Sequence, residues 1–267
     1  MAHSSTWPDR ISGLAAYEKV VIAVSVILVA FLIVDPLVLT AVRGFDIGLK
    51  RSFQPLTGLG RSNWILIPSG LGILLLAWLR AQEEGFRRLV AYGFASQLLI
   101  FLFAAVALSG LTASLTKNIL GRARPKLFEQ MGPLEFQPFS FDHDFASFPS
   151  GHATTAGALA AFLAILWPRA RVAFFLAGGW VAATRFLIGT HYFTDAVGGF
   201  ALGVAFVYLL RNRMARRRWL FRMGRDGAVH LRGRALLDAA TGDVRTRIGK
   251  LIPRAISRAL SSGEPRQ

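Results

Sequence analysis

Three short stretches decide the fold and the chemistry of this chain: Lys117-x6-Arg124-Pro125, Pro149-Ser150-Gly151-His152 and Thr184-Arg185-x5-His191-x3-Asp195. Each lies at or beside the end of a strongly apolar segment, and their fixed positions collect three cations, two histidines and one carboxylate. Charges this close to a membrane core are costly unless they are paired or line a polar cavity, so such a cluster indicates a functional site. Three fixed cations indicate a site for a multiply charged anion.

The apolar segments predict an all-α membrane protein. The chain has 267 residues, of which 53% are hydrophobic, yet its formal net charge is +16. A helix needs about 20 apolar residues to cross the hydrocarbon layer, and helices satisfy their own backbone groups in lipid. We therefore predict a bundle of six membrane-spanning helices, at 20–42, 64–80, 89–113, 152–167, 172–189 and 196–210.

The loop charges predict the orientation of this bundle. Of the 31 Lys and Arg residues, 22 fall in the segments that would share a side with the two termini. By the positive-inside rule we expect a cytoplasmic N-terminal segment, 1–19, a membrane domain, 20–210, and a basic cytoplasmic tail, 211–267. The motifs would then face the periplasm or exterior of a bacterial cytoplasmic (inner) membrane.

The tail carries 15 basic and 4 acidic residues. Its apolar positions predict an amphipathic helix at 244–260 that would lie on an anionic inner leaflet, although a soluble tail fits the charges equally well. No nucleic-acid recognition motif accompanies the basic residues, so we expect no nucleic acid partner. The chain has no cysteine, which excludes disulfides, thiolate metal sites and cysteine nucleophiles.

Two of the motifs predict an anion-binding cradle. Lys117 and Arg124 are seven residues apart, so we expect them on one face of the third span, which Pro125 would end. Ser150 is a good N-cap, and Gly151 lets a ligand approach the free N–H groups and the positive end of the helix dipole.

The histidines predict phosphoryl transfer at this cradle. His191 and Asp195 have i, i+4 spacing, so the carboxylate is expected to accept from one ring nitrogen and leave the other as a nucleophile or base. His152 opens another helix. In such a site one histidine attacks phosphorus, the other protonates the leaving oxygen, and the cations stabilise the equatorial oxygens.

The three motifs resemble, in order and with acceptable gaps, those of the type 2 phosphatidic acid phosphatase superfamily of integral-membrane lipid phosphatases. The resemblance covers 117–195 by motif and most of 20–210 by span pattern. It implies that His191 is the nucleophile that forms a phosphohistidine, that Asp195 orients it, and that His152 is the general acid.

The resemblance also implies that the phosphate is held by five residues: Lys117, Arg124, Ser150, Gly151 and Arg185. The third motif of the family usually opens with Ser, and Thr184 keeps the hydroxyl here. The family works without a metal, so we expect no metal and no cofactor.

We expect a lipid phosphatase that acts on a phosphorylated membrane lipid. The motifs do not choose between undecaprenyl diphosphate, phosphatidylglycerophosphate, phosphatidic acid and lipid A, because each presents a phosphate monoester or diphosphate end. A phosphotransferase that passes the phosphoryl group to a second lipid would use the same residues. A transporter of anionic lipids would also place cations near helix ends, but the sequence has no inverted repeat.

Three further segments are expected on the outer side of the membrane, and their sequences predict their structure less specifically than the three motifs do. Asp35 precedes Pro36 near the end of the first span, and we expect a structural role for it. Residues 45–59 are expected to form a short interfacial helix followed by a loop. The outer loop 125–148 lacks helical or strand periodicity, so we expect a lid or binding loop, in which 142–144 form hydrogen bonds and hold no metal.

Overall fold

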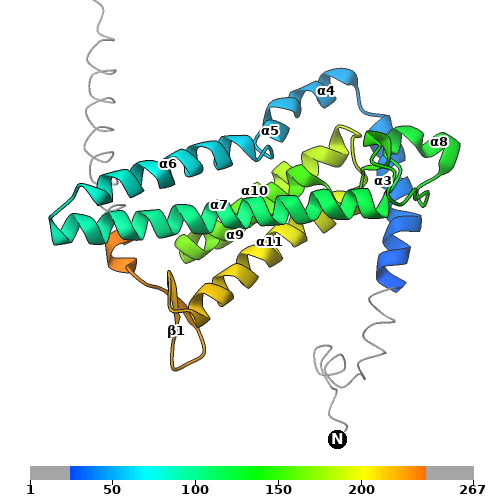
Figure 1. Cartoon of the computed structure of the whole chain (residues 1–267). Coiled ribbons are helices and arrows are strands. Elements are labelled where there is room, and N and C mark those ends of the chain that lie inside the picture. Colours follow the sequence, from blue (N-terminus) through cyan, green and yellow to red (C-terminus); the bar gives the residue numbers. More distant parts are fainter. Residues whose placement is uncertain (1–24, 239–267) are drawn as a thin grey trace, which may run out of the picture. The chain divides into compact units, whose positions relative to one another are not determined.

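The computed structural model describes residues 25–238, and this part of the chain is mostly helical (Figure 1). Five helical stretches in it are long and apolar enough to cross a membrane: Ser25–Arg43, Ile47–Ala81, Phe86–Leu120, Pro168–Leu187 and Phe193–Arg216. The remaining predicted span, 152–167, corresponds to a shorter apolar helix, Gly151–Leu166. The chain is therefore an integral membrane protein. The predicted N-terminal segment 1–19 and the tail helix 244–260 lie outside the described residues.

The elements follow the apolar runs and their breaks. A π-helical segment, Ala30–Val34, leads into α3 (Asp35–Arg43). Then come α4 (Ile47–Ser52), α5 (Gln54–Gly58), α6 (Asn63–Ala81), α7 (Phe86–Leu120), α8 (Phe128–Met131), α9 (Gly151–Leu166), α10 (Arg171–Leu187) and α11 (Phe193–Arg216). Single 3-10 turns lie at Pro125–Leu127, His143–Phe145 and Pro168–Ala170. Pro55 stands in the first turn of α5, where proline is tolerated, so the expected loop after the interfacial helix is itself helical.

The chain divides into two compact units. Within residues 25–238, the first comprises 25–71 and Ile100–Leu210, and the second comprises Gly72–Leu99 and 211–238. All of the predicted site residues belong to the first unit. Helices α6, α7 and α11 each contribute residues to both units.

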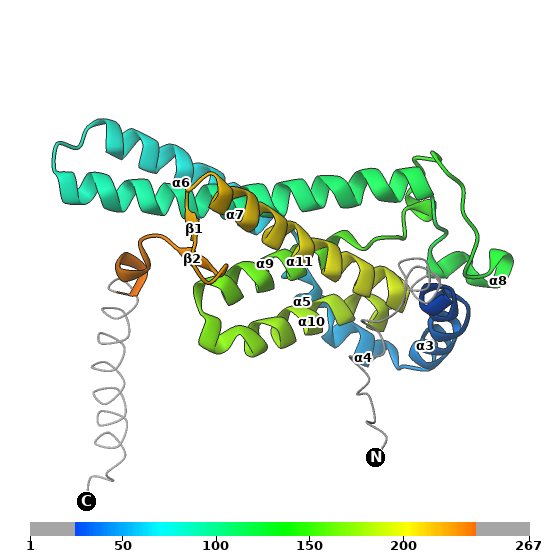
Figure 2. The same cartoon turned by 90° about the horizontal axis from the view of Figure 1, so that it is seen from below.

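Helix α9 is the buried helix of the first unit, running beside α10 and α11 (Figure 2). Glycines let α11 approach it closely. A Cβ atom at Gly203 would lie 2.0 Å from the carbonyl oxygen of Thr154, and one at Gly199 would lie 2.4 Å from that of Ser150. Small residues allow such close backbone packing in membranes. Because of it, the Ser150 N–H donates to the carbonyl oxygen of Asp195 at 3.0 Å, which joins the starts of the two helices.

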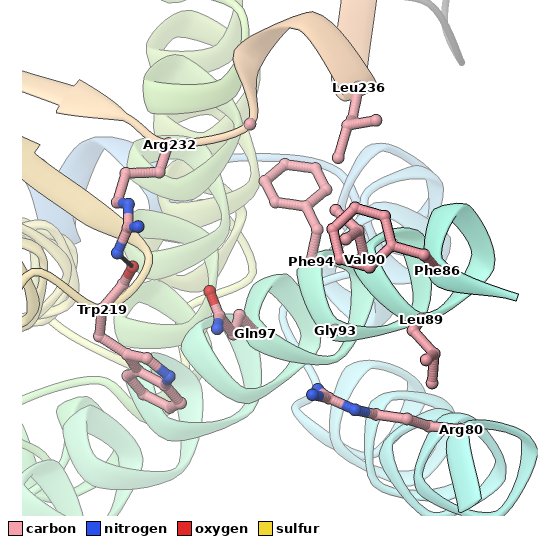
Figure 3. Close-up of a pocket in the computed structure, with 11 residues that line it drawn as sticks. Arg80, Phe86, Leu89, Val90, Gly93, Phe94, Gln97, Trp219, Arg232 and Leu236 are labelled. Atoms are coloured by element: carbon pink, nitrogen blue, oxygen red, sulfur yellow. Dashed lines mark hydrogen bonds between the residues drawn. The ribbon is translucent and has the colours of Figure 1, made fainter. Parts of the chain in front are cut away.

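The second unit contains a two-stranded antiparallel sheet that the sequence did not predict. Strands β1 (Phe221–Met223) and β2 (Val229–Leu231) pair with Arg222 opposite His230. This unit also contains a pocket of about 480 Å³. Parts of α6 and α7 and residues around the sheet line it (Figure 3). Arg80 lies against Gly93, and Arg232 donates to the carbonyl oxygen of Trp219 at 3.3 Å. None of the predicted site residues lines this pocket.

The close packing of α9 and α11 predicts a specific sensitivity to added volume. Gly203→Ala should lower the free energy of unfolding by about 1–3 kcal/mol, because the new methyl group meets backbone that cannot rotate away. The matched control is Gly179→Ala in α10, where a Cβ atom would have no neighbour within 4 Å. Thermal unfolding of the detergent-solubilised protein checks the pair, and equal melting temperatures would contradict the packing argument.

Candidate active site

The first motif does not lie on one continuous helix. Helix α7 ends at Leu120, and Gly121 follows with a positive φ of 63°. A Cβ atom at Gly121 would lie 1.7 Å from the carbonyl oxygen of Gln137, so only glycine fits this turn. The expectation that Lys117 and Arg124 share a helical face was therefore wrong. Lys117 belongs to the last turn of α7, whereas Arg124 has extended backbone in the loop that follows.

Carbonyl groups of the loop 125–148 hold Arg124 in place. Its backbone N–H donates to the carbonyl oxygen of Asp144 at 2.8 Å, and its Nε donates to the carbonyl oxygen of His143 at 2.8 Å. Its Nη2 donates to the carbonyl oxygen of Ala146 at 3.3 Å. Burial lowers the pKa of the Arg124 guanidinium, whereas the charges of Asp195 and Asp144 oppose that shift. The loop thus fixes a partly buried cation beside the candidate site.

The second motif forms the start of α9. Ser150 occupies the N-cap position, as predicted, but its hydroxyl makes no capping bond and is buried without a partner among the described residues. A Cβ atom at Gly151 would lie 3.6 Å from the Nζ of Lys117, so the ammonium group stands directly over this turn. A hydroxyl, the N–H groups of a helix start and an ammonium group therefore converge here.

Arg185 closes this group from the last turn of α10. Its Nη1 donates to the hydroxyl of Thr57 at 2.8 Å, while its buried Nε has no partner in the described part of the chain. Lys117, Arg124 and Arg185 are near enough to repel one another. Leaving a buried donor unpaired costs about 1–3 kcal/mol, so a bound anion that accepts from these groups would be stabilised.

The ring of His191 is oriented differently from the prediction. Its Nδ1 lies 2.9 Å from the carbonyl oxygen of Ser147 and 3.6 Å from Oδ2 of Asp195. A carbonyl oxygen only accepts, so Nδ1 carries the proton and Nε2 keeps its lone pair. The predicted partner, Asp195, lies within ion-pair distance of Nδ1, but the Ser147 carbonyl is the nearer acceptor. Burial lowers the pKa of His191, against the opposing effect of Asp195, which favours the neutral ring that a nucleophile needs.

Asp195 instead has its oxygens occupied by other donors. Oδ2 accepts from the Ser147 hydroxyl at 2.6 Å and from the Tyr192 N–H at 2.8 Å. Oδ1 accepts from Nη1 of Arg122 at 2.6 Å. Ser147 therefore binds Asp195 with its side chain and His191 with its backbone. Ser147 thus connects the carboxylate of Asp195 to the ring of His191.

Arg122 is a residue that the sequence analysis missed. Its side chain is fully buried, and its Nη2 donates to Oδ2 of Asp35 at 2.7 Å. The hydroxyl of Thr194 accepts from Arg122 at 2.9 Å and donates to Asp35 at 2.5 Å. Asp35 thus has the structural role that was predicted for it. In the sequence, Arg122 is a third basic residue between Lys117 and Arg124. Nothing in the pattern indicated that Asp35 and Asp195 would be its partners.

The other predicted positions have local roles. Thr184 is buried and donates to the carbonyl oxygen of Val181 at 2.6 Å. Asp142 caps the 3-10 turn by accepting from the Asp144 N–H at 2.9 Å, and Asp144 pairs with Lys126 at 2.5 Å. The segment 142–144 therefore forms loop hydrogen bonds, as expected. Within residues 25–238, no group of three or more His, Asp or Glu side chains is arranged to hold a metal ion.

His152 completes the set, half-buried at the start of α9. It lies close enough to Arg185, His191 and Lys117 to feel their charges, and also that of Arg61, which the sequence analysis did not single out. A neutral ring nitrogen, a second histidine and several cations therefore meet at the ends of helices. Such a set can perform nucleophilic attack on a phosphate and protonate the group that leaves.

The fold and these groups define an integral membrane protein with the side chains of a phosphoryl-transfer site. The chain belongs to the PAP2 superfamily, whose family model matches residues 98–219. A lipid A 1-phosphatase of Rhizobium johnstonii is 40% identical over 186 residues, which cover 67% of this chain and 73% of that protein. A lipid A 1-phosphatase of Rhizobium etli is 39% identical over 67% of this chain and 77% of that protein. The phosphatidylglycerophosphatase B of Bacillus subtilis is 28% identical over 51% of this chain and 75% of that protein.

The buried ion cluster around Arg122 predicts a large loss of stability when its cation is removed. Arg122→Met should lower the free energy of unfolding by about 3–5 kcal/mol, because Asp35 and Asp195 stay buried without a cation. The control Arg88→Met removes an exposed pair with Glu83 and should change little. Melting temperatures in detergent test this difference, and similar values for both variants would rule out a stabilising cluster.

Proposed function

We propose that this chain is a membrane lipid phosphatase that works through a phosphohistidine intermediate at His191. The observation that carries the proposal is a pair of buried donors, Ser150 Oγ and Arg185 Nε, that have no partner within residues 25–238 and lie beside a histidine whose Nδ1, not its Nε2, is bonded to a carbonyl oxygen. Arg185 and His191 are also joined directly, since the carbonyl oxygen of Arg185 accepts from the His191 N–H at 3.2 Å.

The reaction proceeds in two displacements. Nε2 of His191 attacks phosphorus, the bond between phosphorus and the lipid oxygen breaks, and His152 protonates that oxygen as it leaves. His152 then removes a proton from water, which attacks the phosphohistidine and releases inorganic phosphate. Lys117, Arg124 and Arg185 stabilise the charge on the equatorial oxygens in both steps. The Ser147 carbonyl and the charge of Asp195 stabilise the positive ring of the intermediate.

The relatives support one of the four candidate substrates. Two relatives that share about two fifths of their aligned residues with this chain are lipid A 1-phosphatases. We therefore favour the 1-phosphate of lipid A, ahead of phosphatidylglycerophosphate, phosphatidic acid and undecaprenyl diphosphate. We also propose that the site faces the periplasm and that both termini are cytoplasmic. The proposed reaction needs no metal.

A panel of lipids tests the proposed activity. The purified full-length protein should release inorganic phosphate from lipid A 1-phosphate faster than from the other three lipids, and a chelator of divalent ions should leave that rate unchanged. Measuring free phosphate and phosphorylated lipid products together separates hydrolysis from transfer to a second lipid. A rate that a chelator abolishes and only an added divalent ion restores would contradict the metal-free chemistry.

Substitution of the two histidines tests their separate roles. His191→Ala should abolish turnover of every substrate, because no nucleophile remains. His152→Ala should slow lipid hydrolysis by about 10²–10⁴-fold, yet affect an aryl phosphate much less, because an activated leaving group needs little protonation. His230→Ala, which changes an exposed histidine of the second unit, is the control. Equal losses on both substrates would remove His152 from the role of general acid.

A further inference from the structure

The pocket of about 480 Å³ in the second unit has no part in the proposed reaction (Figure 3). We refer to it as the α6–α7–sheet pocket. Its lining comes from the last turn of α6, the first half of α7 and the residues on either side of the β1–β2 hairpin. Every lining residue belongs to the second unit, so the pocket is a feature of that unit alone. Its volume lies within the range of about 300–1,000 Å³ for small-ligand sites.

The polar part of the lining suits an anion. It comprises Arg80, Gln97, Trp219 and Arg232, and none of the described Asp or Glu residues lines the pocket. Arginine and tryptophan side chains donate hydrogen bonds and accept none. The wall therefore presents two positive charges and mainly N–H donors. Such a wall favours a group with several negatively charged oxygens, and a guanidinium binds phosphate through two parallel N–H···O bonds.

The guanidinium of Arg80 is directed into the pocket by a glycine. An arginine at the end of a membrane helix usually extends toward water. Arg80 stands in the last turn of α6, but its Nη1 lies over Gly93, where a Cβ atom would be only 2.9 Å away. Gly93 is about 10 Å along α7 from the start of that helix. The charged group therefore points away from the turn between α6 and α7, and Gly93 leaves room for it.

The guanidinium of Arg232 is fixed at the pocket wall by backbone groups. Its Nη1 donates to the carbonyl oxygens of Arg218 and Trp219, the residues that precede β1. These bonds join the two ends of the β1–β2 hairpin. Both use the same nitrogen, so within residues 25–238 they leave Nε and Nη2 for a ligand.

The other side of the pocket is apolar and open. Figure 3 shows Phe86, Val90, Phe94 and Leu236 together, apart from the guanidinium groups of the two arginines. Phe86 is 79% exposed, and Val90 and Leu236 are exposed as well. A free phosphate ion would leave these side chains uncovered. A molecule with an anionic head and an apolar chain would contact both sides of the pocket.

The charge of the second unit also favours an anionic partner. Its described residues, 72–99 and 211–238, include 12 arginines but only four Asp or Glu residues. Three of these four, Glu83, Asp226 and Asp238, already lie within ion-pair distance of a basic residue of the same unit. A positive potential of this kind attracts anionic lipids, by about 1 kcal/mol for each basic residue near the membrane surface.

We propose that the α6–α7–sheet pocket binds a phospholipid with a net negative head group. Arg80 and Arg232 hold the phosphate, and the acyl chains cover the apolar side. By the positive-inside rule the 12 arginines indicate the cytoplasmic side, so the lipid belongs to the inner leaflet. This site uses none of the residues of the proposed phosphatase reaction. Because its lining comes from α6, α7 and the hairpin, a bound lipid stabilises the second unit.

Binding is tested with the full-length protein in a neutral detergent, by native mass spectrometry with three probes. Phosphatidylglycerol is the anionic lipid, phosphatidylcholine carries a phosphate but no net charge, and glycerophosphoglycerol is the anionic head without acyl chains. The dissociation constant of phosphatidylglycerol should be at least about tenfold lower than those of the other two, and this lipid should raise the melting temperature. Equal affinity for phosphatidylcholine would overturn the charge selection, and equal affinity for glycerophosphoglycerol would overturn the assignment to a lipid.

Substitutions at the pocket test its position. Arg80→Gln should raise the dissociation constant of phosphatidylglycerol by about tenfold or more, the effect expected for hydrogen bonds from a charged group. Gly93→Ala should weaken binding in the same direction, because its methyl group displaces the guanidinium of Arg80 and meets no backbone. The matched control is Arg225→Gln, which changes an exposed arginine of the hairpin turn outside the pocket.

Melting temperatures without lipid show whether each variant is folded, and Gly93→Ala is expected to fold because alanine favours helix more than glycine does. Equal losses in Arg80→Gln and Arg225→Gln would mean that only diffuse charge attracts the lipid, and would overturn the proposal. No loss in Arg80→Gln and Gly93→Ala would overturn it as well.

Discussion

One buried guanidinium joins the parts of the chain that carry the candidate chemistry. Arg122 comes from the loop after α7, Asp35 from α3 and Asp195 from α11, and all three side chains are inaccessible to solvent. A buried charge without a partner is strongly unfavourable, so these three groups are stable only when buried together. The first helix, the loop and the last helix of the site therefore depend on one another for their positions, although they are far apart in the sequence.

The contrast between Arg122 and Arg185 separates a structural cation from one that is free to bind a ligand. Arg122 donates to two carboxylates, a hydroxyl and the carbonyl oxygen of Pro133, and its guanidinium lies over the rings of Phe31 and Tyr192. The side chain of Arg185 donates to the hydroxyl of Thr57, and its buried Nε has no partner among the described residues. Both arginines are buried, but only the second has a donor left for an incoming phosphate.

The sequence predicted the helical class and which residues gather at the site, because apolar runs and motif charges are properties of residue type. It did not predict where α7 ends, since that depends on Gly121 and its contact with Gln137, which is distant in the sequence. The bond from His191 to Ser147 was also missed, because any residue supplies a carbonyl oxygen. Spacing suggested Asp195 as the direct partner, but spacing does not show that Arg122, Ser147 and Tyr192 already occupy its oxygens.

The loop 125–148 holds Arg124 and His191 mainly by its backbone. Carbonyl oxygens of His143 and Ala146 accept from the Arg124 side chain, and that of Ser147 accepts from His191. A backbone carbonyl is the same for every residue type, so the exposed side chain of His143 can diverge while the path of the chain is kept, whereas Ala146 is buried. Relatives can thus change the outward surface of this loop, and with it what the protein meets outside the membrane, without rebuilding the groups beneath.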